Sequence, residues 1–410
     1  MHAGIPITYE NARAAMARKD WEAANYEWRH ILDLDPGNQE ATVGLAESLF
    51  NTGFHQEAIL LLDGLPTDRR PLMAELALGR AYAITQDYAK SKDAYLRILQ
   101  KKPFQVNAFN ELRALYPKLT QEDKKTVKSR LDNIAKAAKG RSDNALKAGK
   151  FSEAAAYYEI ATAHYHTVGL YNDYGLVLLL AGQYQKAHDQ FATLKKLDKL
   201  GFSEVCSNAA IASLSIGNFG EAKTEILDAI QSAENNKRKA QLYNNLGYIL
   251  EMTRKRQEAK FAYQHAMQLD PNLLTAQLNL AFVQQADREY VEAIDNYEKI
   301  LAKHPHNAEV WNRLGFTYEL QFKSKPALSA YQKAIGADPK FKESYINLAL
   351  LYKKMGKLKQ ANDTLRQLAE MGFAEMEAQK DTNSQANLQK NPLKYVVLFP
   401  SNPHVIANIQ

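Results

Sequence analysis

Cysteine is nearly absent from this chain of 410 residues, in which Cys206 stands alone. An intramolecular disulfide is therefore excluded, and a zinc site built on cysteines is not expected. The longest apolar runs, 176–181 and 395–399, fall far short of the roughly 20 residues that cross a bilayer. No basic segment followed by an apolar core opens the chain, so no signal peptide is visible. We expect a cytoplasmic protein, or a periplasmic or envelope-associated one if an N-terminal signal has been removed.

Glycine and proline, the residues that most often interrupt helices, are few, at 19 and 13. Apolar residues make up 46% and charged residues 24% of the chain, which is typical of a folded soluble protein. This composition excludes a disordered or collagen-like chain. Because helix-forming residues are plentiful, the sequence predicts an all-α fold.

One pattern recurs along the second half of the chain at a constant interval. A leucine is followed by a small residue, and the small residues of successive copies are separated by 34 positions: Gly247, Ala281, Gly315 and Ala349. Within each copy, apolar residues fall at helical spacing twice, and proline closes the first three copies. The interval therefore predicts helical hairpins, which must stack because one hairpin cannot bury its own apolar face.

This pattern resembles the tetratricopeptide repeat (TPR) family in its period and in most signature positions. The same register can be placed on most of the chain, beginning with Ala12, Ala24 and Trp28. The resemblance implies an α-solenoid, a right-handed superhelix of about ten helical hairpins. It also implies a protein-interaction scaffold, whose partner is another protein or a peptide.

The register is interrupted once, which divides the chain into four expected parts. An N-terminal arm of about three repeats and a partial one spans 5–116. An irregular basic segment with a degenerate repeat spans 117–166, and Leu119–Lys139 within it is predicted to be a separate helix with Thr120 as its N-cap. A C-terminal arm of about six repeats spans 167–373. The last part, 374–410, is a cap or tail, whose apolar run either seals the final hairpin or binds a partner or a groove.

The C-terminal arm also contains the predicted binding site. In the TPR family the first helix of each hairpin lines the inner groove, and the residues flanking the Leu-Gly pair point towards it. The position before the pair holds Asn208, Asn245, Asn279, Arg313 and Asn347, and the position after it holds Tyr248, Phe282 and Phe316 in the three middle copies. Asparagine amides can pair with both groups of a peptide bond, and aromatic rings supply apolar pockets. These residues predict capture of an extended peptide or partner helix, unless they serve only contacts between helices.

Positive charge is concentrated in residues 113–150, which contain 11 basic and 4 acidic side chains. The basic residues proposed as a face for an anionic partner are Lys124, Lys125, Lys128, Arg130, Lys136, Lys139 and Arg141. Such a face suits an acidic protein or an anionic surface, but it is also typical of a solvated helix. Because no aromatic residues are interleaved, nucleic acid is not the expected partner, and any membrane contact would be peripheral.

Signatures of catalysis are missing from the sequence. Its histidines do not cluster with carboxylates at ligand spacing, its glycines form no phosphate-binding loop, and Cys206 is expected to be a buried thiol. We therefore expect no enzyme activity, cofactor, metal site or small-molecule substrate. Two other functions stay open. One is a structural subunit of an assembly, such as a bacterial secretion, pilus or envelope machine, that acts through self-association or convex-face docking. The other is a substrate-recruiting arm of an enzyme complex.

Overall fold

The computed structural model describes residues 5–67, 70–197 and 202–371. Within these ranges the chain folds into 21 α-helices and one short 3-10 helix, with no β-strand among the described residues. The predicted all-α fold is thereby confirmed. The chain divides into two compact units, 1–170 and 171–410.

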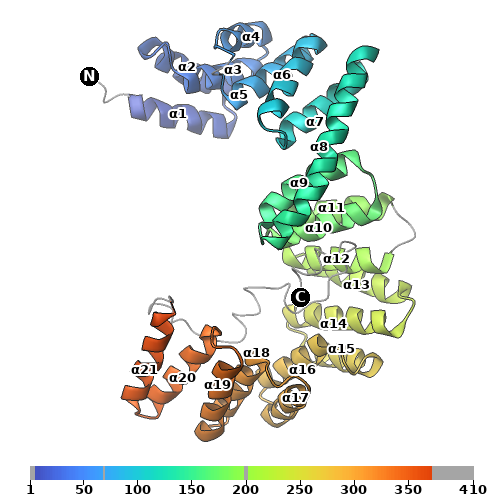
Figure 1. The fold of residues 1–410 in the computed structure, drawn as a ribbon, viewed down its shortest axis with the longest axis vertical. Helices are drawn as coiled ribbons and strands as arrows, with labels where there is room; N and C mark the ends of the chain where they lie inside the picture. The colour runs from blue at the N-terminus through green and yellow to red at the C-terminus, as the bar shows by residue number, and fades with distance from the viewer. Residues whose placement is uncertain (1–4, 68–69, 198–201, 372–410) are drawn as a thin grey trace. The chain divides into compact units, whose positions relative to one another are not determined.

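The helices of the two units are drawn in Figure 1. The first unit contains α1 (Ile5–Arg18), α2 (Trp21–Leu34), α3 (Gln39–Asn51), α4 (His55–Asp63), α5 (Leu72–Ile84), α6 (Tyr88–Lys101), α7 (Val106–Leu115), η1 (Tyr116–Lys118), α8 (Gln121–Lys147) and α9 (Phe151–His164). Helix α10 (Val168–Leu180) begins at the boundary, and the second unit continues with α11 (Tyr184–Leu197), α12 (Phe202–Ser215), α13 (Phe219–Ser232), α14 (Asn236–Met252), α15 (Arg256–Leu269), α16 (Leu274–Ala286), α17 (Tyr290–Lys303), α18 (Ala308–Leu320), α19 (Ser324–Ala337), α20 (Lys342–Lys354) and α21 (Leu358–Glu370).

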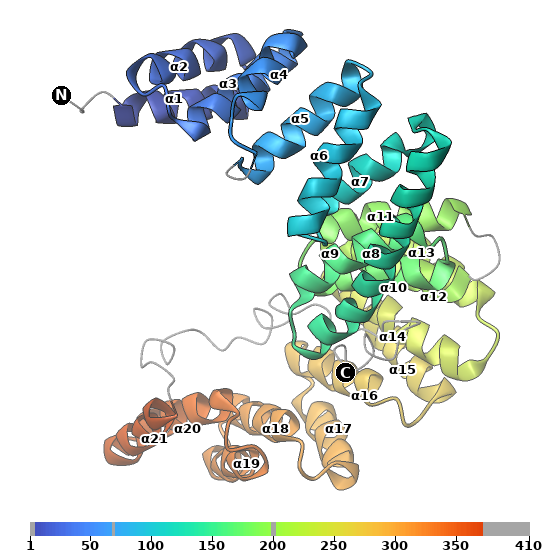
Figure 2. The same ribbon diagram turned by 45° about the horizontal axis from the view of Figure 1, so that its top comes forward.

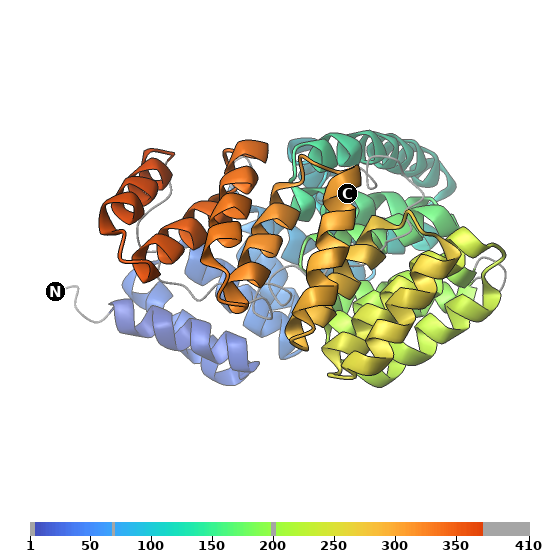
Figure 3. The ribbon, with the colours of Figure 1, turned by 90° about the horizontal axis from the view of Figure 1, so that it is seen from below.

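Successive helices pair into hairpins, from α1/α2 to α5/α6 and from α8/α9 to α20/α21, which gives ten in the described part of the chain. This number agrees with the prediction. Figure 3 shows the hairpins from α14 (yellow) to α21 (red) following one another. In the second unit we call the even-numbered helices α10–α20 the first helices and the odd-numbered ones α11–α21 the second helices.

The second unit curves because its two sets of helices pack at different spacings. First helix α12 packs on α14, α14 on α16, and α18 on α20, whereas successive second helices approach one another less closely. A stack whose members are closer on one side bends towards that side. The first helices therefore form the inner face of the second unit, as the TPR resemblance implied.

Small residues in the first helices allow the two helices of a hairpin to pack closely. A Cβ atom built on Gly247 would lie 2.5 Å from the ring of Tyr263, and one on Gly315 would lie 2.7 Å from the ring of Tyr331. Both tyrosine rings are fully buried. The glycine thus provides the space that an aromatic residue of the second helix fills, which explains why both recur with the period of the hairpins.

The interruption in the repeat lies where the sequence predicts it. Helix α7 has no second helix of its own, since α8 pairs with α9 instead (Figure 2). The predicted separate helix is present, and Thr120 caps it by accepting a hydrogen bond from the backbone N–H of Asp123 at 3.2 Å. It extends to Lys147, eight residues beyond the predicted end at Lys139, because Ala145 and Leu146 are buried and continue its apolar face.

The predicted domain limits are not settled by this division into two units. The units meet at 170/171, near the predicted start of the C-terminal arm at 167. The predicted tail, 374–410, and its apolar run lie outside the described residues.

Replacing Gly247 with alanine should destabilise the protein by about 1–3 kcal/mol, because the new methyl group must displace the ring of Tyr263. The same substitution at Gly336 is the control. No atom lies within 4 Å of its added Cβ, so the free energy of unfolding should rise by about 0.5–1 kcal/mol through higher helix propensity. Urea denaturation of the two variants measures both effects. Equal effects at the two sites would contradict the close-packing explanation.

Candidate functional site

The predicted asparagines of the inner face connect neighbouring hairpins. Each donates its Nδ2 to a side chain on the preceding first helix. The four bonds are Asn208 to Asn172 Oδ1 (2.8 Å), Asn245 to Ser207 Oγ (3.0 Å), Asn279 to Asn244 Oδ1 (2.9 Å) and Asn347 to Asn312 Oδ1 (3.0 Å). We call this set the asparagine ladder. It joins positions 35 to 38 residues apart in the sequence.

Burial strengthens the structural role of the asparagine ladder. Asn208 and Asn245 are 0% exposed, and Asn279 and Asn347 are 2% and 6% exposed. A buried amide that lost its partner would cost about 1–3 kcal/mol, so these bonds fix the register of one hairpin against the next. The structure thus places the asparagines between helices, the second role considered for them. As contacts to a ligand they stay a prediction.

Arg313 stands where the asparagine ladder is interrupted. Its counterpart on the preceding first helix is Leu278, which offers no acceptor. Arg313 instead donates two hydrogen bonds, from Nε and Nη2, to Glu309 Oε1 at 3.1 and 2.8 Å. Its guanidinium lies 3.3 Å from the ring centroid of Phe282, a cation–π contact. Helices α16 and α18 also pack less closely than α14 with α16 or α18 with α20.

The predicted apolar residues become more accessible along the second unit. Tyr248 on α14 and Phe282 on α16 are buried, at 0% and 3% exposure. Phe316 on α18 is partly exposed, and Leu350, the equivalent residue on α20, is 36% exposed. Tyr248 and Phe282 are therefore packed beneath the surface of the inner face, whereas Phe316 and Leu350 are accessible on that surface.

A second polar series, absent from the sequence predictions, runs within the hairpins. The buried tyrosines of the second helices α15, α17 and α19 each donate the hydroxyl to the residue twelve positions earlier on the first helix. The pairs are Tyr263 with Glu251 (3.2 Å), Tyr297 with Gln285 (3.3 Å) and Tyr331 with Glu319 (3.0 Å). The tyrosine and its acceptor are twelve residues apart in all three pairs, and this constant spacing could have identified the pairs from the sequence.

Burial perturbs the first of these pairs. Loss of solvation raises the pKa of Glu251 to about 7, although the hydrogen bond from Tyr263 and the charges of Arg256 and Arg313 oppose the shift. The neighbouring hairpin carries an uncharged glutamine, Gln285, in the same place. A neutral side chain can therefore accept the same hydrogen bond from the tyrosine hydroxyl.

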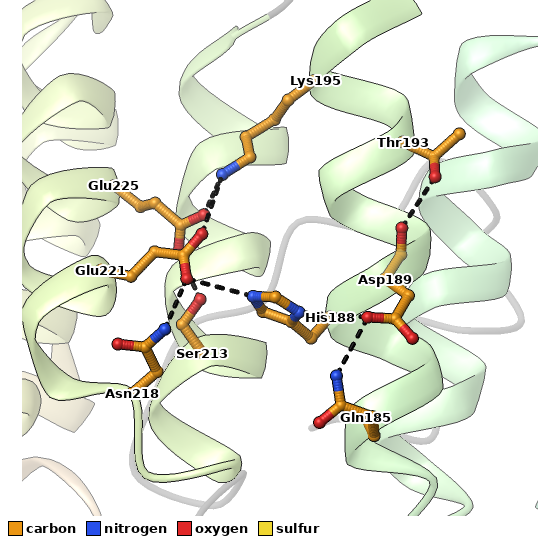
Figure 4. Close-up of polar contacts among 9 residues, drawn as sticks. All are labelled: Gln185, His188, Asp189, Thr193, Lys195, Ser213, Asn218, Glu221 and Glu225. Atoms are coloured by element: carbon orange, nitrogen blue, oxygen red, sulfur yellow. Dashed lines mark hydrogen bonds and ion pairs between the residues drawn. The ribbon is translucent and has the colours of Figure 1, made fainter.

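Second helices of neighbouring hairpins are joined by charged side chains (Figure 4). Lys195 on α11 forms an ion pair with Glu225 on α13 and lies 3.9 Å from Glu221. Glu225 is buried and also accepts a hydrogen bond from Ser213 at 2.7 Å. His188 on α11 contacts Glu221 at 3.2 Å. Charged groups thus connect α11 to α13, as amides connect the first helices.

The predicted basic residues lie on α8, in the first unit. Arg130 and Arg141 are used within the fold. Arg130 donates to the carbonyl oxygen of Leu99 at 3.1 Å, and the Arg141 guanidinium lies 4.7 Å from the ring centroid of Phe104. Lys124 is partly buried, whereas the four remaining lysines are exposed: Lys125, Lys128, Lys136 and Lys139. An anionic partner for this face stays a prediction.

Three further observations concern chemistry. Cys206 is buried as expected, and burial raises the pKa of its thiol to about 11. In the described ranges, no group of three or more His, Cys, Asp or Glu residues is placed to hold a metal ion. Among the helices described, none is both long and apolar enough to span a membrane.

Introducing an asparagine pair where the asparagine ladder is interrupted tests whether the ladder stabilises the junction between hairpins. The single substitutions Leu278→Asn and Arg313→Asn should each destabilise the protein, because each leaves an amide opposite an unsuitable neighbour. The double variant recreates the pair found at the adjacent junctions. It should recover about 1 kcal/mol or more relative to the sum of the singles. Denaturant unfolding of all four proteins gives this coupling energy, and strict additivity would contradict the proposed pairing.

Removing the charge of Glu251 should change how stability depends on pH. The folded pKa of about 7 lies above the usual 4.5, so folding takes up a proton between these values. The free energy of unfolding of the natural chain therefore falls as pH rises from about 4.5 to 7. Glu251→Gln should match the natural chain near pH 4.5 and exceed it by up to about 3 kcal/mol above pH 7. Thermal unfolding across this range is the measurement, with the exposed Glu258→Gln as control; a constant difference between Glu251→Gln and the natural chain would contradict it.

Parts of this chain are similar to solved structures. The structure described as MamA 41-end from Desulfovibrio magneticus RS-1 is 20% identical and covers 44% of this chain and 98% of that chain, with a TM-score of 0.38. YrrB, described as a TPR protein with an unusual peptide-binding site, is 20% identical and covers 43% of this chain and 90% of that chain, with a TM-score of 0.34. No curated protein matches the chain.

Family models give the decisive comparison. Models described as tetratricopeptide repeat match residues 9–71, 140–199, 240–273, 275–307, 308–341 and 342–371. Together these matches cover more than half of the chain, and they fall on the stacked helical hairpins described above. The chain belongs to the tetratricopeptide repeat family.

Proposed function

We propose that this protein is a non-catalytic scaffold that binds an extended peptide or a partner helix on the inner face of its second unit. The observation that supports this most is the accessibility of Phe316 and Leu350, which occupy equivalent positions on the neighbouring first helices α18 and α20. Apolar side chains that the fold leaves accessible on adjacent helices can receive apolar side chains of a partner.

Arg313 adds a polar element next to Phe316. The two residues are three positions apart on α18 and so lie on the same side of the helix. Because Glu309 and Phe282 hold the guanidinium, little side-chain entropy remains to be lost when a ligand binds. We expect the guanidinium of Arg313 to donate hydrogen bonds to an acidic group or to a backbone carbonyl oxygen of the partner. The buried asparagines contribute by holding the first helices at the spacing that this site requires.

Assembly through the second helices is a second candidate function. Phe261 on α15 and Val291 on α17 are 71% and 70% exposed, and Leu227 on α13 is 45% exposed. These apolar side chains lie on the outer helices of consecutive hairpins. They favour docking of a further copy or of a larger machine on the convex side.

Two matched double variants separate these functions. Phe316→Ala with Leu350→Ala should lower affinity for a captured partner about tenfold or more, because both contacts are on the inner face. Phe261→Ala with Val291→Ala should leave that partner bound. The measurement is quantitative capture from native lysate by each purified variant, with light scattering for the oligomeric state. Loss of partners or of oligomers in the second variant alone would favour the convex face and reject the inner-face site.

A further inference from the structure

The lysines of α8 recur with a period that the sequence prediction did not include. They form three Lys-x-x-Lys pairs, which are Lys125 with Lys128, Lys136 with Lys139, and Lys147 with Lys150. Equivalent members of successive pairs are 11 residues apart, which is about three turns of an α-helix. The first five of these lysines therefore lie on one side of α8, within about a third of its circumference. We call these five residues the lysine stripe.

The lysine stripe is long and accessible. Helix α8 has 27 residues and is the longest of the described helices (Figure 1). At a rise of about 1.5 Å per residue, the stripe extends about 33 Å from Lys125 to Lys147. All five lysines are exposed, and none of them forms an ion pair with a carboxylate in the part of the chain that the structure describes. The fold therefore leaves their positive charge unneutralised.

Two carboxylates on the same side of α8 reduce this charge without cancelling it. They belong to Asp132 and Asp143, which are both less exposed than the lysines of the stripe. Asp132 lies 3.0 Å from Nε2 of His164 on α9, so it is directed towards the neighbouring helix. Glu122 is exposed but lies in the first turn of α8, before the stripe begins. This side of the helix thus presents five positive groups against two negative ones.

The stripe offers charge without the other features of a specific protein interface. Such interfaces are depleted of lysine and enriched in aromatic residues and arginine. None of the large apolar side chains that are exposed in the described ranges lies on α8. The arginines of α8, whose planar groups could grip a single carboxylate or phosphate, contact Leu99 and Phe104 within the fold instead. Lysines act as point charges, and a row of them suits a broad anionic surface such as lipid headgroups.

We propose that the lysine stripe docks the first unit on the surface of a lipid bilayer that contains anionic headgroups. Helix α8 lies along the plane of the headgroups, and each lysine is attracted to their negative charge. No large apolar side chain of α8 is available to enter the acyl region, so binding is peripheral and reversible. Salt screens the attraction over about 10 Å at 0.1 M, so binding weakens as salt is raised. The site does not depend on the function proposed for the second unit.

Co-sedimentation of the full chain with lipid vesicles tests this docking surface. One set of vesicles contains two parts of phosphatidylcholine to one part of anionic phosphatidylglycerol, and the other contains phosphatidylcholine alone. The natural chain should sediment with the anionic vesicles at low salt and stay in solution with the neutral ones. Raising the salt concentration should release it from the anionic vesicles. Polyglutamate and a short DNA duplex, each titrated with the chain in separate experiments, are the probes for other anionic partners.

Two matched triple variants then separate the stripe from the net charge of the protein. The stripe variant combines Lys125→Gln, Lys136→Gln and Lys147→Gln. It should lower the partition coefficient for anionic vesicles about a hundredfold, at about fivefold for each lysine. The control variant removes three charges from exposed lysines of the second unit, by Lys325→Gln, Lys340→Gln and Lys359→Gln, and should partition like the natural chain. Glutamine keeps the helix propensity of lysine, and thermal unfolding verifies that both variants fold.

Four outcomes would overturn the proposal. The first is equal binding of the natural chain to anionic and neutral vesicles. The second is a stripe variant that binds anionic vesicles like the natural chain. The third is a control variant that loses as much affinity as the stripe variant, since net charge alone would then explain binding. The fourth is a natural chain that binds polyglutamate or the DNA duplex but not anionic vesicles, which would assign the stripe to an acidic protein or to nucleic acid.

Discussion

Each helical hairpin of this protein leaves an apolar face that only the next hairpin can cover. That constraint accounts for the repetition of the chain and for the residues that recur with it. A small residue such as Gly247 and a buried ring such as Tyr263 are two halves of one contact, since the ring occupies the space that a Cβ would take. All hairpins must stack, so the apolar contacts are similar at every junction. The junctions differ mainly in the polar side chains that connect neighbouring hairpins.

Neighbouring hairpins are connected by one kind of polar group on the inner side of the stack and by another kind on the outer side. On the inner side of the second unit, amides join first helix to first helix through buried hydrogen bonds, as between Asn279 and Asn244. On the outer side, ion pairs such as that of Lys195 with Glu225 join α11 to α13. Neutral amides suit the fully buried positions of Asn208 and Asn245, because desolvating them costs far less than desolvating charges. The inner face is consequently held at fixed spacing before any partner binds.

The sequence predicted the fold well because a fixed period and its signature residues depend on local contacts. It predicted the extra helix and its cap at Thr120 for the same reason. The asparagine positions were identified, but their partners were not, because a bond between Asn347 and Asn312 depends on how two hairpins align. Trp28 was recognised only as a repeat residue. The position of its ring depends on the missing side chain of Gly44 in the following hairpin, because a Cβ atom there would lie 2.3 Å from the indole, and periodicity does not contain this relation.

The junction between α16 and α18 has a mechanical consequence. Each of the other junctions from α12 to α20 carries a hydrogen bond from an asparagine side chain between its first helices. Here the cation–π contact of Arg313 with Phe282 takes its place, and the helices pack less closely. A stack of hairpins in which one junction is less rigid than the others does not bend evenly. Thermal motion and external load concentrate at the less rigid junction, so α18–α21 should swing as a block relative to α12–α17 about this point.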